Sequence, residues 1–106
     1  MPKYLVQANY VGEGVKGLLK EGGTSRRAAV EKLIKSLGGT LEAFYYAFGE
    51  TDAYVIADIP DNASMAAIAL TVSASGAATV KTTVLMTPED IDEAAKKTPS
   101  YRPPGQ

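Results

Sequence analysis

Apolar residues recur along the chain with two different periods, and the change of period marks out the elements of the fold. Between residues 3 and 10 they alternate with other residues, which predicts a first strand. From residue 15 to residue 37 they return at the three- and four-residue spacing of an amphipathic helix. Gly22-Gly23 divides this stretch, so we expect two helical pieces, the second capped by Thr24 or Ser25 and closed by Gly38-Gly39.

Alternation returns in the middle of the chain and predicts a β-hairpin. Residues 41–48 and 53–59 are the expected strands, joined by the tight connection Gly49-Glu50-Thr51-Asp52. Strict alternation places Leu41, Ala43, Tyr45 and Ala47 on one face and Glu42, Phe44, Tyr46 and Phe48 on the other. Both rows are largely apolar, so helices on one side of the sheet leave an apolar face that needs another cover.

The last third of the chain continues the pattern. Asp61 is a plausible N-cap for a helix that stops at Gly76, residues 79–85 form a fourth strand, and Thr87-Pro88 starts a helix that ends near Lys97. The order βαββαβ with a C-terminal helix predicts an α+β, ferredoxin-like fold with a four-stranded antiparallel sheet and two helices on one face. The uncovered face predicts a homodimer or higher oligomer formed through the sheet.

The amino-acid composition excludes several kinds of catalytic and metal site. The 106 residues include no cysteine and no histidine, which excludes thiol nucleophiles, Cys/His metal centres, haem on a proximal histidine and Ser-His-Asp triads. We therefore expect no metal and no cofactor. The net charge of −1 argues against a nucleic-acid partner, although residues 11–37 carry six bases against three acids. The uncharged run 62–80 is too rich in small residues for a membrane span, and we expect a cytoplasmic protein.

Several segments together resemble the GYD domain family. They are MPKYLVQANY, LLKEGGTSRRAAVEKLIKSLGGTLEAFYYAFGETD, AYVIADIPD, and KTTVLMTPEDIDEAAKK followed by YRPPG. The resemblance implies a single domain over residues 1–98, a proline-rich tail over 99–106, and similarity in fold to the dimeric α+β barrels. That superfamily includes cofactor-free monooxygenases, isomerases and haem-dependent dismutases, so the resemblance implies no particular reaction.

The motif that names the family falls on residues 49–52, where Gly49 and Asp52 match and Thr51 replaces the expected tyrosine. Asp52 is a candidate carboxylate base if burial raises its pKa. The alternative is that Asp52 is an ordinary turn residue that hydrogen-bonds nearby backbone.

Two further groups are candidates for binding. The first is a polar row on the sheet, to which we assign Gln7, Asn9, Tyr46, Tyr54, Asp58 and Lys81. An apolar pocket with a few such groups would bind a small molecule, and the alternative is that these side chains only satisfy one another in a dimer interface with Phe44, Tyr46 and Phe48 in its core. The second is the glycine loop before Arg26 and Arg27, which suits an anion or else is a solvated helix start.

These candidates leave two classes of function. In the first, the protein is a small-molecule-binding protein or a cofactor-independent enzyme that acts on an apolar or aromatic anion between sheet and helices. Asp52, Tyr46 and Lys81 would then be the acid-base and orienting groups, and Gln7, Asn9, Tyr54, Arg26 and Arg27 would bind the ligand. In the second, the protein is a non-catalytic, self-assembling interaction or scaffold protein.

Overall fold

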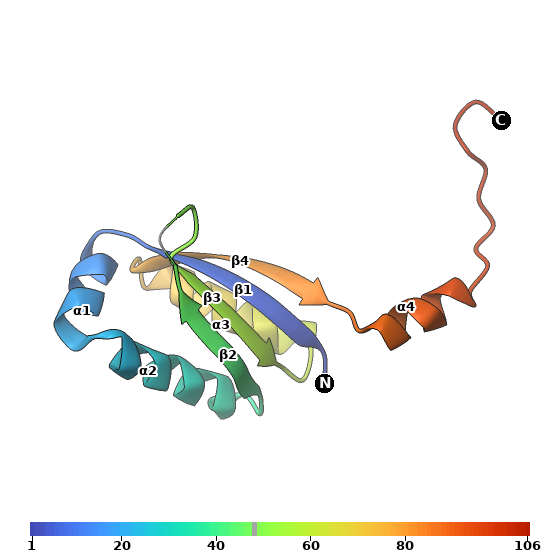
Figure 1. The fold of residues 1–106 in the computed structure, drawn as a ribbon. Helices are drawn as coiled ribbons and strands as arrows, with labels where there is room; N and C mark the ends of the chain where they lie inside the picture. Colours follow the sequence, from blue (N-terminus) through green and yellow to red (C-terminus); the bar gives the residue numbers. More distant parts are fainter. Residues whose placement is uncertain (48) are drawn as a thin grey trace.

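The computed structural model describes residues 1–47 and 49–106, and it shows an α+β fold (Figure 1). The elements in chain order are β1 (Lys3–Tyr10), α1 (Glu13–Glu21), α2 (Gly23–Ser36), β2 (Thr40–Tyr46), β3 (Ala53–Asp58), α3 (Asn62–Ala74), β4 (Ala78–Leu85) and α4 (Pro88–Ala95). This order confirms the expected succession of strands and helices, including the division of the first helical stretch at Gly22.

All strand pairs of the sheet are antiparallel, in the order β2-β3-β1-β4. On β1, Tyr4, Val6, Ala8 and Tyr10 point to the side where α2 and α3 lie, as their lining of a common cavity and core shows. We call this side the covered face. The other side carries Lys3, Leu5, Gln7 and Asn9 of β1 and their cross-strand neighbours, and we call it the bare face.

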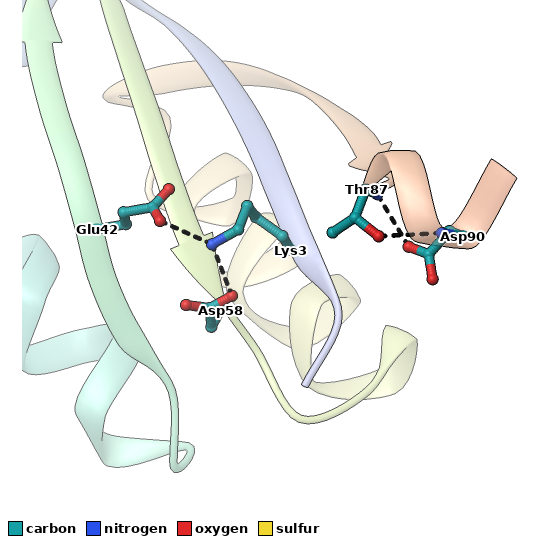
Figure 2. Close-up of polar contacts among 5 residues, drawn as sticks. All are labelled: Lys3, Glu42, Asp58, Thr87 and Asp90. Atoms are coloured by element: carbon teal, nitrogen blue, oxygen red, sulfur yellow. Dashed lines mark hydrogen bonds and ion pairs between the residues drawn. The ribbon is translucent and has the colours of Figure 1, made fainter. Parts of the chain in front are cut away.

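Helix caps follow the sequence in two places and depart from it in one. The Asp61 side chain accepts a hydrogen bond from Ser64 N, and Thr87 with Asp90 forms a reciprocal capping box at the start of α4 (Figure 2). The expected cap at Thr24 or Ser25 is wrong. Helix α2 begins at Gly23 without a side-chain cap, because Gly22 turns the chain at a φ of 83° and already lets the helix start there.

A β-bulge in β2 overturns the strict alternation expected for the hairpin. Between Leu41 and Ala43 the register with β3 shifts by one residue, so Leu41 joins Phe44 and Tyr46 on the covered face. Ala43 and Tyr45 lie on the bare face instead. Phe44 packs on the hydrophobic core, so assigning Phe44 and Tyr46 to a dimer core was wrong. Phe48, assigned to the same core, lies outside the described residues.

The hydrophobic core lies between the covered face and the two long helices. Its buried members are Tyr4, Ile34, Val55, Ala57, Ile59, Met65 and Ile68. Two glycines allow the layers to approach closely. A Cβ on Gly39 would lie 2.6 Å from Asp58 O, and one on Gly14 would lie 1.9 Å from Ala77 O. These positions therefore tie the helical layer to the sheet and to the α3–β4 turn.

The bare face combines apolar side chains with one ion-pair cluster. Lys3 Nζ lies 2.9 Å from Glu42 Oε1 and 3.0 Å from Asp58 Oδ1 (Figure 2). Hydrogen bonds to these carboxylates raise the pKa of Lys3. Tyr45 is 70% exposed and Tyr54 39% exposed, and Leu5 and Ile56 are partly buried beside them. These two exposed rings are cross-strand neighbours on the bare face.

Candidate functional site

A cavity of about 270 Å³ lies between the covered face of the sheet and the helices α2 and α3. Its walls are mostly apolar, and many of the residues are alanines: Ala8, Ala29, Ala53, Ala57, Ala69, Ala77 and Ala78. Small side chains on facing layers leave a space that larger residues would fill. The volume exceeds the ~150 Å³ that holds a benzene ring and is a little below the range of about 300–1,000 Å³ typical of ligand pockets.

Arg26 supplies the charge in this otherwise apolar wall. Its Nε lies 3.2 Å from Glu21 Oε1, at the end of α1. Among the described residues, however, this buried Nε has no acceptor in hydrogen-bonding geometry, so the ion pair leaves its N–H unsatisfied. Because Arg26 also lines the cavity, its guanidinium brings a positive charge to the wall.

Two tyrosines lie beside this guanidinium. Tyr10 lines the cavity, and the Tyr46 hydroxyl donates a hydrogen bond to Gly23 O over 3.0 Å. Burial raises the pKa of Tyr10 to about 12, and it raises the pKa of Tyr46 too, while the charge of Arg26 acts in the opposite direction on both. Both phenols are therefore protonated at neutral pH and are hydrogen-bond donors rather than bases.

Close packing at Gly23 fixes the place of Tyr46. A Cβ on Gly23 would lie 2.9 Å from Tyr46 Cε2, so only glycine leaves room for the ring in this position. The ring also stacks at a tilt on Phe44, with centroids 5.1 Å apart. The first residue of α2 and the last residue of β2 thus pack directly against each other.

Asp52 is connected to β1 rather than to the cavity. Its Oδ2 accepts a hydrogen bond from Tyr10 N over 3.0 Å, and its own N–H donates to Asn9 Oδ1 over 2.9 Å. The neighbouring Thr51, which is buried, donates from its hydroxyl to Gln7 Oε1. Asp52 therefore makes the local backbone contacts expected of a turn residue, and it holds the end of β1 from which Tyr10 enters the cavity.

The structure separates the polar side chains that the sequence grouped together. Gln7, Asn9, Tyr54, Asp58 and Lys81 lie on the bare face, and Gln7 pairs with both Tyr54 and Lys81 in the register of the sheet. Tyr46 does not belong to this row, because the bulge in β2 turns it to the covered face. Asp52, Tyr46 and Lys81, the suggested acid-base and orienting groups, thus lie at a turn and on opposite faces of the sheet.

The two arginines of the glycine loop also separate. Arg26 turns inward to the cavity, whereas Arg27 is exposed near Glu31 and the outer side of β2. Sequence reasoning missed Tyr10, Glu21 and the alanines that open the cavity. The alanine content of both helix faces was a usable signal, because an alanine-rich contact between layers either packs closely or leaves a void.

A search against models of protein families finds the GYD domain, which matches residues 4–95. The chain belongs to the GYD domain family. The match covers nearly the whole chain, from the first strand through α4, and so confirms the resemblance seen in the sequence. No curated protein and no solved structure matches this GYD domain chain.

The described residues were also compared with the requirements of a metal site and of a membrane-spanning helix. Across residues 1–47 and 49–106, no group of three or more acidic side chains is placed to hold a metal ion. In the same part of this GYD domain protein, none of the helices has the length and apolarity that crossing a membrane requires. The cytoplasmic location stays a prediction.

Proposed function

We propose that this GYD domain protein binds a small apolar anion in the cavity between the sheet and the helices α2 and α3. The observation that carries the proposal is the position of Arg26, the one charged side chain among the described residues that line this mostly apolar cavity. A cavity of about 270 Å³ suits a single aromatic ring or a short aliphatic chain with one carboxylate. An apolar enclosure strengthens the attraction between the carboxylate and the guanidinium.

The tyrosines define the expected orientation of this ligand. With a pKa of about 12, Tyr10 is a neutral phenol at physiological pH and donates to the carboxylate beside Arg26. The ring or chain of the ligand then lies among the alanines and Val55, away from solvent. Binding alone is proposed, because Asp52 is engaged by the backbone of β1 and Lys81 lies on the bare face.

The test compares benzoate with benzyl alcohol, which has the same ring and no charge, by NMR titration at fixed ionic strength. We expect the wild type to bind benzoate more tightly, and Arg26→Met to lose about 10- to 100-fold of that affinity, the range for a hydrogen bond to a charged group. Arg27→Met is the matched control, because it removes the same charge from an exposed position outside the cavity. Equal binding of both probes by the wild type, or equal losses in both variants, contradicts the proposal.

Self-association through the bare face is a second proposal, supported by the exposure of Tyr45 and Tyr54. It corresponds to the alternative of an assembling interaction protein, and it is compatible with ligand binding because the cavity opens on the other side of the sheet. In a two-fold dimer, the same bare face of each copy would cover that of the other.

A further inference from the structure

The last 21 residues, Met86 to Gln106, form an arm that leaves the body of the molecule. We call these residues the C-terminal arm. Figure 1 shows α4 and the tail extending beyond the end of β4, away from the sheet and the other helices. The radius of gyration is 17.0 Å, whereas a compact chain of this length has about 13 Å. Within the described residues, none of the extensive packing between elements involves α4.

The arm nevertheless has a well-specified start. The capping box of Thr87 and Asp90 and the proline at the first helical position define where α4 begins. An isolated helix of eight residues is marginal in water, because helices below about 12–15 residues do not repay their nucleation cost. Helix α4 is short but has a full N-terminal cap, and docking against another surface would supply the stability that its length does not.

One side of helix α4 is apolar and the other is acidic, and basic residues follow it at Lys96, Lys97 and Arg102. Met86 is 65% exposed, Ile91 52% and Tyr101 73%, and Ala94 and Ala95 share the helical side of Ile91. The remaining positions of α4 carry four acids: Glu89, Asp90, Asp92 and Glu93. Helix α4 therefore has one side suited to burial and one side that must stay in water.

We propose that the C-terminal arm docks on a second copy of this chain, with Ile91 and Tyr101 as its anchors. The inference rests on the proposed self-association through the bare face. A face of four strands, each about seven residues long, offers a plane of only roughly 400–450 Å². A standard interface buries about 800 Å² per partner. The arms would add to the area buried, because each extends beyond the end of β4 with Met86, Ile91 and Tyr101 exposed (Figure 1).

The reach of the arm fits this role. Helix α4 spans about 12 Å, and eight further residues extend up to about 25 Å when they are proline-rich and extended. Together they match the two shorter extents of the molecule, 33 and 23 Å. The arm is thus long enough to lie across a second body, and its acidic side would remain at the rim of the interface.

The test places a photo-cross-linking residue, p-benzoylphenylalanine, at position 91 of the full chain, and at position 93 as the matched control. Light and ¹⁵N-labelled protein are mixed, irradiated and analysed by mass spectrometry. We expect mixed-label cross-links at position 91 and several-fold fewer at position 93. In addition, Ile91→Glu should weaken the dimer at least tenfold, whereas Glu93→Gln should not.

Each other outcome overturns the inference in a recognisable way. Cross-links only within one label place the arm on its own body. A dimer by light scattering that gives no cross-link at position 91 leaves self-association intact and excludes docking of the arm. A wild-type monomer at every concentration excludes both.

Discussion

The two faces of the sheet are built from the same strands and differ in nearly every physical property. On the covered face, small residues such as Ala8, Ala53 and Ala57 are buried and leave a cavity under the helices. On the bare face, the residues that alternate with them include the exposed rings of Tyr45 and Tyr54, which pair across β2 and β3. Alternation along each strand thus separates the proposed ligand site from the proposed surface for self-association.

The residues of the proposed ligand site and those of the proposed assembly surface lie on different faces. Arg26, Tyr10 and Tyr46 serve the covered face, while Lys81, Gln7 and Tyr54 serve the bare face. A substitution on one face should therefore change assembly and leave the cavity intact, and a substitution on the other should do the reverse.

The largest expected effect is on assembly. Tyr54→Glu puts a carboxylate in the middle of the bare face, and we expect the dimer to weaken more than 100-fold, about 2.7 kcal/mol, because the charge would have to be desolvated. Light scattering should then give the monomer mass of 11.1 kDa. Leu70→Glu is the matched control, because Leu70 is 71% exposed on the outer side of α3. Dissociation by the control alone, or by neither variant, would break the assignment of the bare face.

The next effect tests how closely the helical layer sits on the covered face. Gly39→Ala introduces a Cβ within 3 Å of Asp58 O, Ile34 Cγ2 and Ile59 Cδ1, and backbone on one side leaves little room to adjust. We expect a loss of about 2–3 kcal/mol in the free energy of unfolding by urea, as for an overpacked core. Gly17→Ala meets nothing within 4 Å in α1 and should be neutral or stabilise the protein. Similar results for the two variants would contradict this packing.

A smaller loss of stability is expected at Asp52, in the connection between β2 and β3. Asp52→Ala removes the acceptor of Tyr10 N and should cost about 1–2 kcal/mol, because a partly buried N–H loses its partner. Asp52→Asn keeps an oxygen in that place and should cost less than ~1 kcal/mol. Urea unfolding of both variants distinguishes the local role from a catalytic one. If Asn and Ala cost the same, the negative charge itself matters and the turn interpretation fails.

A further effect, confined to alkaline solution, is a pH dependence carried by Tyr10. Its pKa rises from an ordinary value of 10.0 to about 12 in the folded protein, so the folded state holds this proton more tightly than the unfolded state. The stability it contributes is present below pH 10 and is lost as pH rises through about 12. We expect the unfolding free energy of the wild type to fall more steeply in this window than that of Tyr10→Phe. Parallel curves would show that Tyr10 is not buried at the cavity.

The sequence predicted the elements well because their signals are local. Gly22, Asp61 and Thr87 mark helix ends through backbone geometry or caps that depend on a few neighbouring residues. The α+β order and the two apolar rows of the hairpin followed from periodicity alone. Periodicity could not tell which face of the sheet each row of β2 side chains occupies. One extra residue at Glu42 turns the side chains that follow it to the opposite face from the one expected.

The candidate site was predictable only in part for the same reason. Arg26 was selected for its helix start, yet its role at the cavity depends on how α2 docks on the sheet. Tyr10 and Tyr46 are 36 positions apart in the sequence and meet through the register of three strands. The grouping of Tyr46 with Lys81 relied on unbroken alternation, and no glycine or proline in residues 40–46 signals the bulge.

The bulge at Glu42 has a consequence for how copies of the chain can meet. Strand β2 is an edge of the sheet, and an edge with a regular ladder invites the strand of another molecule to extend it. The extra residue interrupts the spacing of the N–H and C=O groups there, and the Glu42 carboxylate is held on this edge strand by Lys3. Growth of an open-ended ribbon from this edge is therefore disfavoured, so β4 is the edge of the sheet that keeps a regular ladder in the described pairing.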